Sequence, residues 1–237
     1  MNILLLIATA FLLNLLSGCG GNDVVSYPVA QAFKNSITNG FSGRFNVSGT
    51  SISSIGTSYP VTGMAAFTLD AGTPNKSFLF PSDANQTTET ISGLMYINNK
   101  MLPLYTSRSL WYDASYQPIG QPNDGWGVCV ADAPGAYPVS AVADMSGTIA
   151  TYQCRSNPTA AVSKTLIATF KTTADPKGDL NFQVTIAVDK IFNKLDTIPG
   201  SPYWFISAYT YRISSSGALS LINLKMTMTS SDGTQEV

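Results

Sequence analysis

Few side chains of the kinds that carry out catalysis occur in this sequence. Histidine is absent, which rules out Ser-His-Asp and Cys-His nucleophilic centres and histidine-ligated metals. Paired carboxylates could still hydrolyse glycosides. The glutamates are Glu89 and Glu236, and aspartates such as Asp70 and Asp175 lie in turn-like sequence, where Asp commonly forms turns. We therefore favour a non-enzymatic function, expect no metal or cofactor, and keep a His-free glycan hydrolase with paired Asp as the alternative.

Two aromatic clusters are the candidate ligand-binding residues. One contains Trp111 and Tyr112, and the other contains Tyr203, Trp204 and Tyr209. Aromatic rings with polar groups can stack on sugars or line an apolar pocket. On a strand, Tyr203 and Tyr209 share one face, and Trp204 points to the other. Because one face of the strand must pack inward, the alternative is that these rings belong to the core.

The chain begins with an apolar run that ends in Leu16-Ser17-Gly18-Cys19. A run of about a dozen apolar residues closed by small side chains is typical of a secretory signal, and it is too short for a permanent spanning helix. Leu16-Ser17-Gly18-Cys19 resembles the lipobox of bacterial lipoproteins. This resemblance implies diacylation of the Cys19 sulfur and cleavage after Gly18. Residues 1–18 would then be the signal peptide and residues 19–26 a lipidated tether.

The resemblance also implies a location. Gly20 follows Cys19 where an inner-membrane lipoprotein carries Asp, which implies the bacterial outer membrane, at its periplasmic face or at the cell surface. The partner would be the membrane, because two or three acyl chains on Cys19 would anchor the protein in it stably. Before the apolar run there is no Lys or Arg. An ordinary signal peptide with a chance cysteine, or an uncleaved anchor, is therefore the alternative.

If Cys19 is acylated, Cys129 and Cys154 remain as an even pair in a compartment that oxidises thiols. We predict a disulfide between them. Two buried free thiols, or a metal site that also uses carboxylates, are the alternatives.

Charged residues make up only 11% of the sequence, against about 25% in an average soluble protein. The 13 basic and 14 acidic residues form no long run of either sign. The sequence therefore lacks the footprint of a nucleic-acid-binding protein, and we expect no nucleic-acid partner.

The rest of the chain, residues 27–237, is predicted as a β-rich domain with one N-terminal helix. Pro28 and the pair Asn39-Gly40 bound an amphipathic helix that we expect to cap a sheet. After Gly40 the apolar period changes to two, which indicates strands, and 76–80 and 109–113 are among the further predicted strands. Alternation is clearest at 180–188, and 203–213 and 218–228 form a predicted hairpin. Residues 116–147 are rich in Gly, Pro and Ala, and are a linker between two β halves or a long loop.

The predicted fold is mainly β, an antiparallel, strongly curved sheet or β-barrel, with a two-sheet β-sandwich as the alternative. Residues Tyr137-Pro138-Val139 and Ser146-Gly147-Thr148, with the strand that follows Lys164, resemble small uncharacterised proteobacterial lipoproteins. A short helix followed by Phe41-Ser42-Gly43-Arg44-Phe45 is similar to the start of the periplasmic lipoprotein-carrier fold, a curved sheet around an apolar cavity. We expect a lipid-anchored envelope protein that binds an apolar ligand or an envelope partner protein, with a purely structural envelope module as a further alternative.

Overall fold

The computed structural model describes residues 25–52, 57–74, 83–123, 127–133, 135–191 and 204–229. The helix is α2, Val29–Asn39. The strands are β1 (Phe41–Ile52), β2 (Ser58–Leu69), β3 (Thr73–Pro74), β4 (Asn85–Ile97), β5 (Lys100–Tyr112), β6 (Pro118–Asn123), β7 (Gly127–Ala131), β8 (Ser146–Arg155), β9 (Lys164–Ala174), β10 (Leu180–Ile191), β11 (Trp204–Ile213) and β12 (Leu219–Thr229). In this part of the chain, no helix has the length and apolar character needed to cross a membrane.

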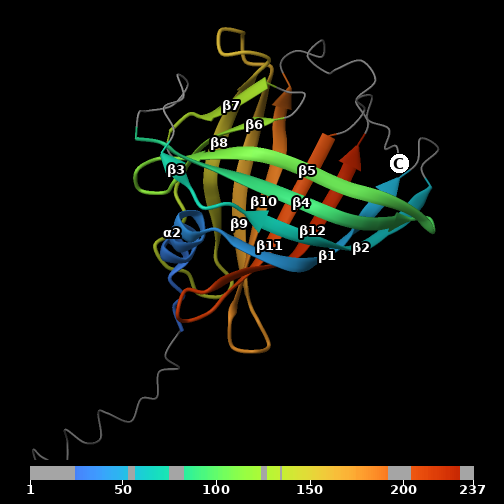
Figure 1. The fold of residues 1–237 in the computed structure, drawn as a ribbon, viewed down its shortest axis with the longest axis horizontal. Coiled ribbons are helices and arrows are strands. Elements are labelled where there is room, and N and C mark those ends of the chain that lie inside the picture. The colour runs from blue at the N-terminus through green and yellow to red at the C-terminus, as the bar shows by residue number, and fades with distance from the viewer. Residues whose placement is uncertain are drawn as a thin grey trace, which may run out of the picture.

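The strands form a closed barrel (Figure 1). Neighbours in the sheet follow the chain order from β4 to β12, and β2 pairs with β4, so that the described residues form an 11-strand barrel with β3 as an extra strand at β4. Each pair is antiparallel except β1 and β12, which run parallel from Asn46 and Asn223 onward. An odd number of strands joined in an up-and-down order requires one such parallel pair. The barrel prediction is confirmed, and the sandwich alternative is wrong.

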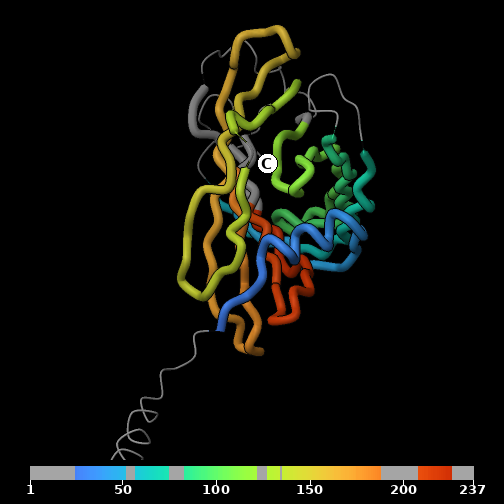
Figure 2. Tube along the Cα trace, turned by 90° about the vertical axis from the view of Figure 1, so that its left-hand side faces the viewer, coloured from blue at the N-terminus to red at the C-terminus, as the bar shows by residue number. Residues whose placement is uncertain are grey.

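Helix α2 covers one end of the barrel (Figure 2). It buries the face that contains Val29, Phe33 and Ile37, the face expected from the sequence spacing. The Phe33 ring stacks on Tyr137 with 4.0 Å between ring centroids, and it meets the Tyr211 ring edge-on at 5.2 Å. The helix is therefore held in place by aromatic contacts with the inner wall of the barrel.

Gly40 ends the helix for two physical reasons. Its φ of +68° lies in the region that L side chains avoid, and a Cβ at this position would come within 2.7 Å of the Leu69 carbonyl oxygen. The expected helix with Pro28 before it and Gly40 after it is confirmed.

Several element predictions need correction. Residues 116–147 do not form a linker between two halves, because they contribute β6 and β7 to the same continuous sheet. The strand predicted at 109–113 is the end of a much longer β5, Lys100–Tyr112. The first half of β5 carries apolar residues on both faces, Leu102 and Leu104 inward and Met101 and Tyr105 outward, so its alternation is hidden. A strand predicted at 76–80 lies outside the described residues.

The two body cysteines face each other across neighbouring strands. Cys129 of β7 is the direct antiparallel partner of Cys154 of β8, and the sulfur atoms are 2.08 Å apart, at the distance of a disulfide bond. Both side chains are fully buried. The bridge therefore fixes the register where the short strand β7 meets the sheet.

Candidate functional site

A cavity of about 70 Å³ lies inside the barrel, beneath α2. A water molecule needs roughly 10 to 15 Å³ on such a measure, and an engineered cavity of about 150 Å³ binds benzene. The cavity therefore has room for about five water-sized groups. It is far smaller than the sites of drug-sized ligands, which span roughly 300 to 1,000 Å³.

Arg108 connects opposite walls of the barrel at this cavity. Its Nε donates to Glu89 Oε1 at 2.7 Å, and Glu89 is its cross-strand partner in β4. Its Nη2 donates to the Tyr209 hydroxyl of β11 at 2.8 Å, and Nη1 donates to Gln121 Oε1 at 3.2 Å. The Tyr209 hydroxyl in turn lies 3.4 Å from Glu89 Oε1. The consecutive strands β4, β5 and β6 are thus joined to the distant strand β11 through one guanidinium group.

The charges of this pair balance inside the barrel. Burial disfavours a charged Arg108, but the attraction of Glu89, the hydrogen bond to it, and the nearby Tyr209 and Tyr211 together outweigh burial, so the pKa of Arg108 lies above its usual value. Glu89 is only 3% exposed, whereas Arg108 keeps 20% of its side chain accessible. Arg108 is one of the residues that line the cavity. Two of the five guanidinium N–H groups take no part in the hydrogen bonds above.

Tyrosines supply the other polar groups of the cavity wall. Burial raises the pKa of Tyr112, Tyr137 and Tyr211 well above the usual value for a phenol, and it raises the pKa of Tyr152 to about 12. The hydroxyls therefore stay neutral and can donate hydrogen bonds. Within the part of the chain that the structure describes, none of these four hydroxyls makes a hydrogen bond to another residue. The wall thus offers several neutral hydroxyl groups that can donate hydrogen bonds.

The predicted ligand-binding residues have different positions. Tyr112 and Tyr209 lie in the core and line the cavity together. Trp111 also borders it, and packs with Ala84 and Ile119 in a small separate cluster. Trp204 begins β11 at the far end of the barrel, opposite Thr229 of β12. The structure does not describe the Trp204 side chain, Tyr203 or Cys19.

Sequence reasoning missed Arg108, Gln121, Tyr137 and Tyr152 as residues of this cavity. A signal for Arg108 was present: it lies four residues before Tyr112 on the same strand, and therefore on the same, inward face. Glu89 likewise alternates in phase with the buried Thr87 and Ile91. A charge in the core phase of a strand predicts a buried partner.

A second buried cation lies near the opposite end of the barrel. Lys164 opens β9 beside Cys154, and it is in phase with the inward residues Leu166 and Ala168. Its side chain is only 3% exposed. Burial lowers the pKa of Lys164 to about 7.

The described residues bring few catalytic groups together. They contain no cluster of three or more His, Cys, Asp or Glu side chains that could hold a metal ion. Of the described residues that line the cavity, Glu89 alone carries a carboxylate, and this carboxylate forms an ion pair with Arg108. A scan against protein-family models finds no match, and neither the curated proteins nor the solved structures yield one.

We predict that replacing both Glu89 and Arg108 with apolar residues costs little stability, whereas replacing Glu89 alone costs much. Glu89→Leu leaves the guanidinium inside the barrel without its counter-charge and should lower the free energy of unfolding by about 3 kcal/mol. The double variant Glu89→Leu/Arg108→Met should recover most of this loss. Urea denaturation measures both, with Arg44→Met on the outer face as a near-neutral control. A single variant as stable as the wild type would contradict the buried pair.

We further predict that Lys164 makes the stability depend on pH. The folded pKa of about 7 lies below the ordinary value of 10.5, so the folded state binds fewer protons than the unfolded state between these pH values. Burial of Lys164 therefore costs stability fully below pH 7, and this cost fades as the pH rises towards 10.5. Lys164→Met should stabilise the protein by roughly 2 to 4 kcal/mol below pH 7 and hardly at all near pH 10.

The measurement is urea denaturation of both proteins across this pH range. Lys171→Met, at an exposed position of the same strand, is the control and should show no such trend. An effect of Lys164→Met that stays constant with pH would contradict the prediction.

Proposed function

We propose that this protein is a non-enzymatic binding protein of the cell envelope, anchored through acyl chains on Cys19, whose barrel binds a small neutral ligand with an acceptor oxygen. The observation that supports it most is the cavity that Arg108 lines together with Tyr112, Tyr137, Tyr152 and Tyr211. A protein interior rarely keeps several polar groups without partners unless water or a ligand satisfies them.

The site suggests a neutral ligand. Glu89 already balances the charge of Arg108, so an anion in the cavity would bring a net buried charge, which is costly. The tyrosine hydroxyls donate to an uncharged carbonyl or hydroxyl oxygen without that cost. Apolar residues such as Ile149 and Val184 form the rest of the wall and suit a short hydrocarbon group.

The cavity is too small for the long apolar ligand of a lipid carrier. It also gives little support to the glycan-hydrolase alternative, which needs a second carboxylate roughly 5 to 10 Å from the first. The described aspartates Asp70, Asp113 and Asp175 lie in turns or at strand ends. A small-molecule binding site fits the geometry better than either.

Three features support the envelope location. Leu16-Ser17-Gly18-Cys19 resembles a lipobox, the surface is poor in charge, and the Cys129–Cys154 bridge suits an oxidising compartment. A disulfide that closes a loop of this length adds roughly 3 to 4 kcal/mol to the free energy of unfolding. A reducing cytosol would not maintain such a bond.

The anchor predicts a specific mass for the mature protein. Protein purified from membranes should have the mass of residues 19–237 plus acyl groups. The thiols of Cys129 and Cys154 should react with the alkylating reagent only after reduction. Intact-mass spectrometry before and after reduction and alkylation gives both results. An unmodified chain with a different start, or three free thiols, would contradict the envelope assignment.

The ligand proposal predicts selective binding of small neutral amides. Propionamide and propionate each have about five non-hydrogen atoms, as many as the cavity admits. Propionamide should bind with a Kd in the micromolar to millimolar range, because a ligand with so few non-hydrogen atoms cannot bind more tightly. Propionate should bind more weakly. Saturation-transfer NMR on the full mature chain measures both.

Two variants locate this binding. Ala168→Leu fills the cavity and should abolish saturation transfer to propionamide, with thermal unfolding as the check on folding. Tyr152→Phe removes one donor at constant shape and should weaken binding roughly tenfold, whereas Tyr96→Phe on the outer surface should not. No transfer in the wild type would show that propionamide does not bind, and equal transfer in Ala168→Leu would show that it binds outside the cavity. Either result would refute the ligand proposal.

A further inference from the structure

The outer surface of the barrel carries an apolar patch on three neighbouring strands. Of the eight large apolar residues that are exposed in the described chain, five lie here. They are Met64 of β2 (58% exposed), Leu94 (44%) and Tyr96 (45%) of β4, and Met101 (59%) and Tyr105 (73%) of β5. We call these five residues the outer patch.

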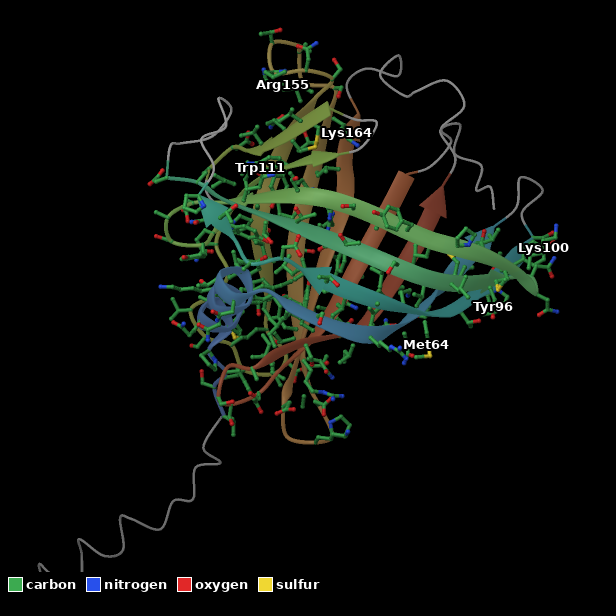
Figure 3. The ribbon with its side chains drawn as sticks, viewed as in Figure 1. Met64, Tyr96, Lys100, Trp111, Arg155 and Lys164 are labelled. Carbon is green, nitrogen blue, oxygen red and sulfur yellow. A yellow bond between two sulfur atoms is a disulfide. The ribbon has the colours of Figure 1, made fainter. Side chains whose placement is uncertain are left out.

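The strand register makes the outer patch continuous. Met64 pairs with Leu94 across β2 and β4, and Tyr96 pairs with Met101 across β4 and β5. Side chains that face the same way on directly paired residues lie about 5 Å apart. Figure 3 shows Met64 and Tyr96 at the same end of the barrel as Lys100, remote from α2. A patch of this kind on one face marks an interaction surface.

Basic side chains lie near the outer patch. Lys100 is exposed at the start of β5, next to Met101 in the chain, although it is in the strand phase of the inward residues Leu102 and Leu104. On the other side, Arg44 of β1 pairs with Ala66 of β2, and Lys225 of β12 pairs with Ser48 of β1. Arg44 and Lys225 are both exposed.

Carboxylates are absent from this face in the described chain. Between Phe41 and Tyr112, the described carboxylates are Asp70, Asp83 and Glu89. Asp70 follows the end of β2 and Asp83 precedes the start of β4, so both lie outside the strands, and Glu89 is inside the barrel. The protein has a net charge of −1, but the patch and its border carry only positive charge.

We propose that the outer patch is a contact surface for an anionic lipid bilayer. Tyrosine suits the boundary between headgroups and acyl chains, exposed methionine and leucine add apolar surface, and nearby Lys and Arg are attracted to anionic headgroups. This contact goes beyond the proposed ligand site, uses other residues, and does not depend on the lipidation of Cys19. It orients the barrel with β2, β4 and β5 against the membrane.

Methionine oxidation provides a test with reporters that the chain already contains. The full mature chain is exposed to hydroxyl radicals with vesicles of phosphatidylcholine alone, with vesicles that also contain phosphatidylglycerol, and without vesicles. Oxidation of Met64 and Met101 should slow by about threefold or more with the anionic vesicles and much less with the neutral ones. Met145, exposed outside the patch, is the internal control and should not change.

Variants separate the contributions of charge and apolar surface. Arg44→Glu/Lys100→Glu should abolish the protection, whereas Lys177→Glu, in the exposed β9–β10 turn, should not. Leu94→Ser/Tyr105→Ser should also reduce the protection, with Val139→Ser as its matched control. All these positions are exposed, and thermal unfolding confirms that each variant folds.

Other occupants of the patch give different results. Protection without vesicles that grows with protein concentration would indicate a second copy and would overturn the proposal. Equal protection by neutral and anionic vesicles, or no protection at all, would also overturn it. None of these results depends on the mass of Cys19 or on propionamide binding, so this proposal can fail while the proposed function stands.

Discussion

The parallel pairing of β1 with β12 is the constraint on which the rest of the structure depends. It closes the sheet, so that no strand edge of the barrel needs protection. Closure also creates an interior, and this interior is wide because the diameter of a barrel grows with the number of strands, here 11. That interior has to be filled, and small residues such as Ala65 and Ala168 cannot fill it alone. Helix α2 and the tyrosines that project from several strands complete the packing, and they leave the cavity beneath the helix.

Arg108 contributes to this closed interior at an energetic cost. Moving a guanidinium and a carboxylate out of water is unfavourable, and their attraction offsets the loss only if further hydrogen bonds satisfy the remaining polar atoms. Gln121 and Tyr209 provide such bonds. A hydrophobic residue would pack without this cost but would not connect β5 to β11 across the interior. The polar network therefore fixes which strands face each other and keeps the neighbouring cavity polar and neutral overall.

Local chemistry in the sequence was sufficient for the elements whose signals are local. Pro28 and Gly40 bound the helix, and the unbroken alternation of β10 and the Ser214–Gly217 turn before β12 predicted strands that the structure contains. The site was not accessible in the same way. Glu89 and Tyr209 are 120 residues apart in sequence, and they meet only because the barrel closes. Tyr112 and Tyr209 could be selected as aromatic candidates, and the strand phase of Arg108 points inward, but nothing local indicates that Arg108 meets Tyr209.

The first half of β5 shows why a missed prediction can be informative. A half-buried strand alternates because water contacts one of its faces. Here Leu102 and Leu104 face the core while Met101 and Tyr105 face outward, so both faces are apolar. The inward residues are accounted for by the barrel itself, whereas the outward ones gain nothing from folding of this chain alone. An apolar outer face, bordered by Arg44 and Lys100 and free of carboxylates in the described chain, is therefore better explained by a contact outside the protein than by the needs of the fold.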